Sequence, residues 1–169
     1  MIVLVILSIL MAFAVPNFNN LIISNQMASY LSDFADALRR AKIESSAKLK
    51  WVTICVRNGN ACSNGNKGTW SDGWLVFVDN DGDAAVDSGD RILYQQQALG
   101  REITFKGTVK GTGNAMRRIT FTPSGHTQLT QEAEMIMCDQ SGALRRRIHM
   151  TVTGHTSPLD NDDIGSGKC

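Results

Sequence analysis

The N-terminal part of the chain constrains its fold most, because no charged residue occurs before Asp33. Residues 1–15 are apolar at every position except Ser8. As an α-helix this run spans about 22 Å, whereas the hydrocarbon core of a bilayer is about 30 Å thick. Three interpretations follow: a secretory signal peptide cleaved near residues 12–14 but lacking a basic start, a buried core helix, or a membrane helix that lacks its first residues.

The residues after this run favour the third interpretation, because a helical pattern continues. Charged side chains fall on one helix face, and apolar side chains recur on the other at spacings of mostly three and four. These apolar residues are Leu21, Met27, Ala28, Leu31, Phe34, Ala35, Leu38 and Ala41. Pro16 removes one backbone hydrogen bond and is expected to kink the helix without ending it. We predict one helix to about Lys50, with an apolar first half suited to lipid and a second half that packs on a domain.

Beyond residue 50 the hydrophobic pattern changes from helical to alternating. Seven short segments are rich in β-branched or aromatic residues and are separated by Gly, Asn and Ser turns. They are residues 51–56, 74–78, 92–95, 103–105, 119–122, 134–138 and 147–152. A long helix followed by about seven strands predicts an α+β fold, in which a small antiparallel sheet, or two small sheets, buries the apolar face of the helix's second half.

Composition and motifs exclude several functions. Seventeen basic and sixteen acidic residues give a net charge of +1, which excludes a globally basic nucleic-acid binder. No nucleophile elbow, P-loop, H-E-x-x-H or dinucleotide-binding motif occurs, so we expect no enzymatic activity and no organic cofactor. His126, His149 and His155 lack the spacing of a triad or metal set and are predicted surface or turn residues. The three tryptophans, Trp51, Trp70 and Trp74, are predicted core and loop anchors.

Several segments carry a family resemblance. Residues 1–18 (MIVLVILSILMAFAVPNF) resemble the N-terminal segment of type IV pilins and type II secretion pseudopilins. In that class a peptidase cuts before a Phe that is followed by Thr-Leu-Ile-Glu-Leu, a stretch expected immediately before Met1. Resemblance to the GspH/FimT family of minor pilins is carried by residues 70–79 (WSDGWLVFVD), the Asp-rich turn after them, residues 92–93, residues 119–125 (ITFTPSG), and the ending around Cys138, the Arg run and residues 153–155.

The resemblance implies a pilin-like fold and a structural role. Residues 1–24 would form the membrane and filament-core segment, and residues 25–169 the globular head, including the amphipathic half of the helix. A single helix would hold the protein in the inner membrane with its head in the periplasm. The protein would then join other pilins in a type IV pilus or a type II secretion pseudopilus, where burial among like helices replaces burial in lipid.

Four cysteines predict two disulfides in an exported protein. Cys55 and Cys62 bracket a turn-forming insert, and a bridge from Cys138 to Cys169 would tie down the polar C-terminal tail. Four free thiols are the alternative. A zinc site is disfavoured because paired C-x₂-C spacings are absent.

An acidic segment at residues 79–90 imitates a calcium-binding loop. Its carboxylates stand at loop positions 1, 3, 5, 9 and 12, which are Asp79, Asp81, Asp83, Asp87 and Asp90. Three features depart from such a loop: Ala84 takes the position of the usual Gly, Asp90 replaces a longer Glu, and the flanking segments read as strands. A solvated hairpin loop is the alternative interpretation.

Basic residues gather toward the C-terminus, where residues 101–150 contain eight basic and four acidic side chains. Arg117, Arg118, Arg145, Arg146 and Arg147 could contact phosphates of double-stranded DNA. Some FimT-like members bind DNA during uptake through a C-terminal Arg-rich motif beginning Gly-Arg, whereas Gly142 is followed here by Ala and Leu. A DNA-binding minor pilin is therefore the second hypothesis. The alternatives are a solvated face or ion pairs with Asp160, Asp162 and Asp163.

Overall fold

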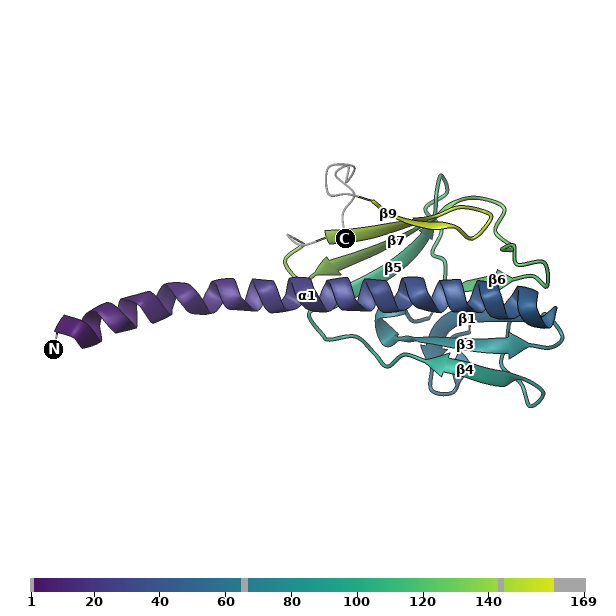
Figure 1. Ribbon diagram of the computed structural model, residues 1–169, viewed down its shortest axis with the longest axis horizontal. Helices are drawn as coiled ribbons and strands as arrows, with labels where there is room; N and C mark the ends of the chain where they lie inside the picture. Colours follow the sequence, from purple (N-terminus) through teal and green to yellow (C-terminus); the bar gives the residue numbers. More distant parts are fainter. Residues whose placement is uncertain (1, 65–66, 143–144, 160–169) are drawn as a thin grey trace.

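The computed structural model describes residues 2–64, 67–142 and 145–159, with side chains from residue 19 to residue 158. Its dominant element is α1 (Ile2–Lys48), a helix of 47 residues that continues through Pro16 and curves gently near its N-terminus (Figure 1). The second half of α1 lies along the head, and the first half projects from it (Figure 1). Among the described residues, no helix is both long enough and apolar enough to cross a membrane. The assignment of residues 1–24 to a membrane stays a prediction.

The end of α1 has a specific backbone geometry. Leu49 adopts a left-handed conformation (φ 52°), and the Lys50 N–H donates to the Ser45 carbonyl over 3.2 Å. This bond, from the second residue past the helix to its last turn, is the Schellman arrangement that usually has Gly at the left-handed position. The helix therefore ends two residues before the predicted Lys50.

The first sheet follows directly from the helix. Its central strand β1 pairs with β3 on one side and with both β6 and β2 on the other, while β4 forms the outer edge beside β3. All these pairs are antiparallel. The strands are β1 (Trp51–Asn58), β2 (Ala61–Cys62), β3 (Trp74–Asp79), β4 (Arg91–Gln95) and β6 (Arg118–Phe121).

The second sheet is also antiparallel and has the order β5-β7-β8-β9. Its strands are β5 (Ile103–Val109), β7 (Ala133–Asp139), β8 (Arg145–Met150) and β9 (Thr156–Leu159). All seven predicted strands are present, and the α+β expectation is confirmed. Two strands were not predicted: β2 has only two residues, and β9 contains Pro158, which is tolerated because β9 is an edge strand.

One predicted strand is displaced. The sequence pattern placed it at residues 147–152, whereas β8 spans Arg145–Met150. The strand ends earlier because the Thr151 N–H donates to the His155 carbonyl over 3.0 Å, which closes the turn into β9. It begins earlier because Arg145 and Arg146 pair in register with Cys138 and Met137 of β7, although a run of arginines has little strand character by itself.

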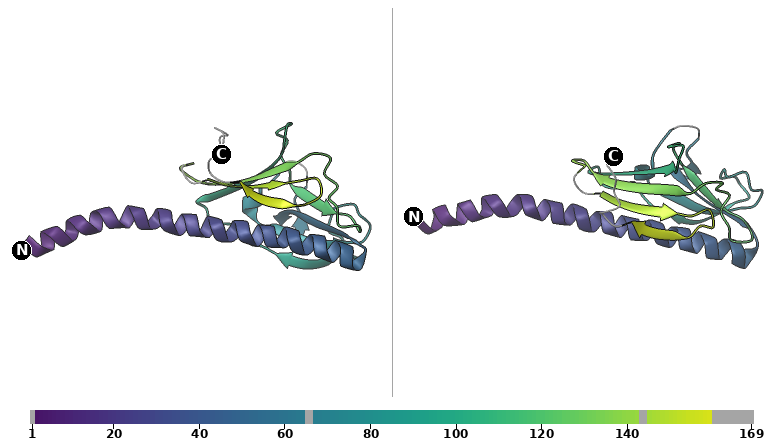
Figure 2. Two further views of the ribbon diagram at one scale, coloured as in Figure 1. Left: turned by 45° about the horizontal axis from the view of Figure 1, so that its top comes forward. Right: turned by 90° about the horizontal axis from the view of Figure 1, so that it is seen from above.

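The core lies between α1 and the two sheets (Figure 2). Phe34 is fully buried at its centre, with ring centroids 5.1 Å from Trp70, 5.1 Å from Trp74 and 5.0 Å from Phe105. Trp74 belongs to the first sheet, Phe105 to the second, and Trp70 to a short 3-10 helix, η1 (Trp70–Asp72). One helix side chain therefore contacts both sheets. The prediction that Trp70 and Trp74 are core anchors is confirmed.

Candidate functional site

A small second core lies on the face of the first sheet that is opposite to α1. Its centre is a disulfide between Cys55 of β1 and Cys62 of β2, whose Cα atoms are 5.5 Å apart. The disulfide packs with Leu75 and Phe77 of β3. This disulfide confirms one predicted pair. Cys138 is buried in β7, and its predicted partner Cys169 lies outside the described residues, so the second pair stays a prediction.

The acidic loop between β3 and β4 is organised by Asp79, which is fully buried. Its Oδ1 accepts the Gly82 N–H (2.7 Å), and its Oδ2 accepts the Ala84 N–H (3.0 Å) and the Thr53 hydroxyl (3.1 Å). Burial raises the pKa of Asp79, and these three hydrogen bonds oppose that shift. Asp79 therefore holds the first turn of the loop in place.

Three of the five predicted calcium ligands come together. Carboxylate oxygens of Asp79, Asp81 and Asp83 lie within 4.8 Å of one another. The other two carboxylates bond elsewhere: Asp87 accepts the Gly89 N–H (2.8 Å), and Asp90 accepts the Asn80 N–H (3.0 Å). Asp79 accepts hydrogen bonds from donors of the protein itself, which is typical of a hairpin loop that the chain organises. Calcium binding stays a prediction.

The sixth position of the acidic loop has the left-handed backbone for which a calcium-binding loop usually has Gly. Ala84 stands there with φ 60°, in the left-handed region where Gly is usual. Trp51 packs beside the same loop, since a Cβ on Gly82 would lie 3.3 Å from its Nε1. The loop thus lies at the ends of β1 and β3 and packs against Trp51, the third of the predicted tryptophan anchors.

The C-terminal arginine run does not form one uniform exposed surface. Arg146 donates to the Ser24 hydroxyl of α1 over 3.2 Å, and Arg145 Nε donates to the Gly142 carbonyl over 2.9 Å. Arg147 lies 3.7 Å from Glu134 and exposes only 11% of its side chain. These alternating directions follow from the two-residue period of a strand. The aspartates suggested as tail partners, Asp160, Asp162 and Asp163, lie outside the described residues.

Arg117 and Arg118 lie in or beside the first sheet, whereas the arginine run at residues 145–147 lies in the second sheet. Arg117 is half-buried, and its Nε donates to the Gly68 carbonyl over 3.1 Å. Arg118 is exposed at the start of β6. The five arginines suggested for DNA binding are thus distributed over two sheets, and Arg147 is largely buried in an ion pair. DNA binding stays a prediction.

Two of the three histidines have the predicted surface or turn positions, whereas the third, His149, exposes only 17% of its side chain. His126 and His155 are exposed in turns. His149 lies half-buried on β8, with its Nε2 3.1 Å from Glu132, which also bonds Lys110 over 2.9 Å. The Lys110 hydrogen bond lowers the pKa of Glu132. Among the described residues, none of the three histidines belongs to a metal-binding group.

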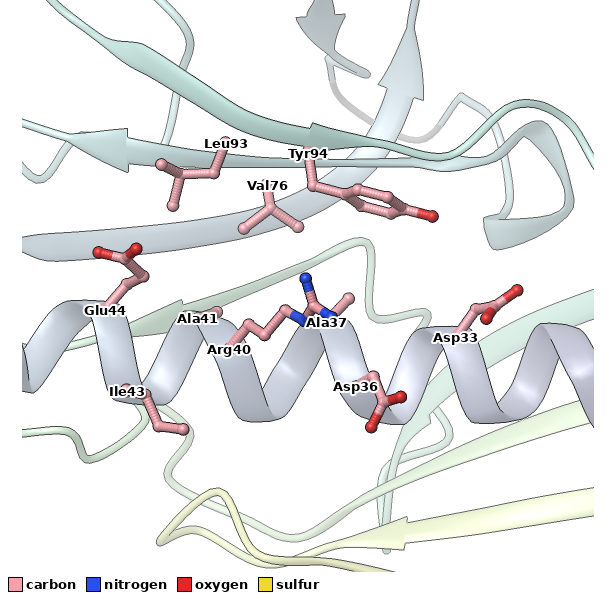
Figure 3. Close-up of a pocket in the computed structure, with 10 residues that line it drawn as sticks. All are labelled: Asp33, Asp36, Ala37, Arg40, Ala41, Ile43, Glu44, Val76, Leu93 and Tyr94. Carbon is pink, nitrogen blue, oxygen red and sulfur yellow. The ribbon is translucent and has the colours of Figure 1, made fainter.

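A groove between α1 and the edge strand β4 was not predicted from the sequence. It encloses about 550 Å³ and has charged side chains along the helix and apolar ones on the sheet (Figure 3). Arg40 and Glu44 extend from α1 toward the sheet, and the Tyr94 ring lies along the opposite side of the groove on β4 (Figure 3). Burial raises the pKa of the Tyr94 hydroxyl, and the charge of Asp33 raises it further. Nothing in the sequence pattern indicated that β4 would be the edge strand facing the helix.

Comparisons with known proteins give a consistent result. The family model described as type II transport protein GspH matches residues 31–154. No curated protein matches the chain significantly. Two crystal structures of the type IV minor pilin FimU from Pseudomonas aeruginosa have TM-scores of 0.59 each, with 15% and 16% sequence identity. They cover 84% and 82% of this chain, and 94% and 97% of the FimU chains.

A structure of the minor pseudopilin EpsH from the type 2 secretion system of Vibrio cholerae is also similar. Its TM-score is 0.53 at 8% identity, and the alignment covers 76% of this chain and 91% of that chain. At such low identities, the structural matches show that the fold is shared. The long helix and antiparallel head are therefore a pilin-like fold.

Proposed function

We propose that this chain, which belongs to the GspH family of type II transport proteins, assembles through α1 into a type IV pilus or a type II secretion pseudopilus. Family membership makes the protein a structural pilin or pseudopilin subunit and not an enzyme. The proposal adds how the subunit is held before assembly and how it joins the filament.

The projecting half of α1 is the observation that carries the proposal. Met27 is the first buried side chain of the helix among those described. Ile23 already packs against the core and Ser24 contacts Arg146, so residues 2–22 extend about 32 Å beyond the head as helix. Their sequence is free of charge, and residues 2–15 are apolar at every position except Ser8. Such a segment is stable only in lipid or among other apolar helices, and pilin assembly supplies both environments in turn.

The disulfide supports an exported head. Cys55 and Cys62 form a structural disulfide, and such bonds persist in oxidising compartments such as the bacterial periplasm. We therefore place the head in the periplasm and the first part of α1 in the inner membrane as a single span. After assembly the same segment would lie in the filament core.

Filament incorporation provides the test. Filaments sheared from the producing cells should contain the full chain, and deletion of residues 1–24 should remove it from them. The deleted chain should remain soluble and unfold cooperatively, because Met27, Phe34, Leu38 and Ala41 keep their places in the core. If the deleted chain still joins filaments, assembly does not depend on the projecting helix. If it aggregates, the division at residue 24 is wrong.

A further inference from the structure

The strands of the head place a group of arginines where α1 leaves it. Strands β4 and β7 end, and β5 and β8 begin, at the end of the head from which the first half of α1 projects (Figure 1). Arg101 lies between β4 and β5, and Arg145 and Arg146 begin β8. We call these three residues the exit arginines. They come from segments far apart in the sequence, so no sequence run reveals them as one group.

Contacts near residues 24–26 bring two of the exit arginines close to the helix. Arg146 donates to Ser24 of α1 over 3.2 Å, and the Gln140 side chain donates to the Arg101 carbonyl over 3.1 Å. A Cβ on Gly100 would lie 4.0 Å from Gln26 Oε1, so the segment that bears Arg101 passes beside the helix. Arg101 itself is exposed. The guanidinium of Arg146 thus lies beside residue 24 of α1, and the backbone next to Arg101 passes beside residue 26.

An acidic loop lies at the opposite end of the head. The acidic loop joins β3 to β4 at the end of the head where α1 terminates (Figure 1). It contains five aspartates and no cation between residues 79 and 90. Acidic residues also occur near the exit arginines, namely exposed Glu102 and buried Asp139. Cations flank the acidic loop, since Lys50 bonds Asn80 over 2.7 Å and Arg91 follows Asp90, so the excess of negative charge is confined to residues 79–90.

Exposed apolar side chains lie in α1 just before the exit arginines. Leu21 is 56% exposed and Ile22 is 44% exposed. From Ile22 to Gln26 the helix rises about 6 Å, and the polar layer on each side of a bilayer is roughly 5–8 Å thick. If Leu21 and Ile22 rest at the inner boundary of that layer, the exit arginines lie at the depth of the phosphates. Apolar side chains below and arginines above are typical of a membrane-interface surface.

We propose that the exit arginines bind the phosphate groups of anionic phospholipids in the leaflet from which α1 emerges. The inference rests on the proposed membrane insertion of α1, and adds a lipid-specific contact by the head. A basic side chain near an anionic membrane surface strengthens attachment by about fivefold. The contact holds the head upright against the bilayer before assembly and is given up when α1 moves into the filament.

The experiment uses the full chain reconstituted into vesicles of phosphatidylcholine, with or without phosphatidylglycerol. Phenylglyoxal modifies accessible arginines, and mass spectrometry then gives a modification rate for each one. With phosphatidylglycerol, Arg101 should react at least about threefold more slowly, and high salt should restore its rate because the contact is electrostatic. Arg91, exposed at the opposite end of the head, should react equally in both vesicles and serves as the internal control.

Variants sharpen the test. In R101Q/R146Q, the exchange of backbone N–H groups in residues 96–102 should no longer depend on phosphatidylglycerol. The matched variant R39Q/R91Q removes two exposed arginines elsewhere and should keep that dependence. R101Q alone repeats the test without touching the Arg146–Ser24 contact, so a folding defect in the double variant leaves the question answerable.

The outcomes are separable. If the chain fails to float with phosphatidylcholine vesicles, α1 does not insert, and both the proposed function and this inference are overturned. If it floats but Arg101 reacts equally in both vesicles, only the lipid contact is overturned. If a short DNA duplex protects Arg101 and Arg146 at physiological ionic strength while phosphatidylglycerol does not, the surface recognises nucleic acid and the lipid proposal is wrong.

Discussion

The two cores of the head are stabilised in different ways. The large core surrounds Phe34 and joins α1 to both sheets mainly by apolar packing. The small core, on the opposite face of the first sheet, has four buried residues and relies on the Cys55–Cys62 disulfide. Beside it, the buried carboxylate of Asp79 holds the covering loop. A small apolar cluster removes too little surface from water to order its own loops, so a covalent bond and a buried acceptor complete it.

The largest effect is expected in the large core. Phe34→Ala should lower the free energy of unfolding by about 3–5 kcal/mol, because it removes a buried ring and leaves a cavity between the two sheets. Urea unfolding of residues 25–169, followed by tryptophan fluorescence, measures the change. Phe34→Leu is the control and should cost about 1.5 kcal/mol or less, since it keeps most of the volume. If Phe34→Ala lowers the free energy of unfolding by less than Phe34→Leu does, the sheets hold together without the helix.

The disulfide should have the next largest effect. Replacing Cys55 and Cys62 with Ala should cost about 2.4 kcal/mol, the chain entropy released by opening a loop of this size. The midpoint of urea unfolding reports the loss, and non-reducing peptide mapping of the parent should recover the joined pair. The same map tests the predicted Cys138–Cys169 pair. An unchanged midpoint would show that the small core needs no covalent link.

Asp79→Asn should destabilise the small core by about 1–3 kcal/mol at neutral pH, because the amide nitrogen cannot accept the Ala84 N–H. Asp81→Asn is the matched control at an exposed position of the same loop and should change stability by less than about 0.5 kcal/mol. Equal costs for the two variants would contradict the organising role of Asp79.

The Asp79 effect also has a pH dependence. Because burial raises the pKa of Asp79 in the folded state, protonation favours folding at this site. The stabilisation is complete below the pKa of the unfolded chain and is lost as the pH rises through the folded pKa. The difference in unfolding free energy between the parent and Asp79→Asn should therefore grow as the pH falls through that range. A difference that shrinks would mean that the folded pKa is lowered.

The smallest effects concern two left-handed residues, one near each core. Leu49→Gly should raise stability by about 1 kcal/mol, because it relieves the left-handed strain at a side chain that is 74% exposed. Ala84→Gly relieves similar strain but removes a buried methyl group, so its gain should be smaller, about 0.5 kcal/mol. Thermal unfolding midpoints of the two variants give the comparison. Destabilisation by Leu49→Gly would indicate that this exposed leucine makes a stabilising contact.

The large core was predictable from the sequence because periodicity encodes it. The spacing of Phe34, Leu38 and Ala41 predicted the buried helix face, and the alternating segments predicted seven of the nine strands. The pairing of strands that are distant in the sequence was not predictable, because it depends on which strands belong to each of the two sheets. The strand β9 was missed because Pro158 is a local signal against a strand that only its edge position overrides.

The candidate sites were predicted less well, because they depend on where the side chains point as well as on which residues occur. The carboxylates of the acidic loop were found by spacing, yet the three-dimensional turn separates Asp87 and Asp90 from the group around Asp79. The arginine run was found as a charge cluster, yet strand alternation sends Arg146 to α1 and Arg147 to Glu134. The grouping of Arg101 with Arg145 and Arg146 required the fold itself.

The position of Phe34 between two sheets determines how the head responds to a pulling force. The second half of α1 lies lengthwise along the head, with buried residues from Met27 to Ala41. Tension on the projecting half therefore loads all these contacts together in shear, instead of opening them one after another. An interface loaded in this way resists extraction far better than one that peels. The head is mechanically strongest along the one axis on which its helix can be pulled.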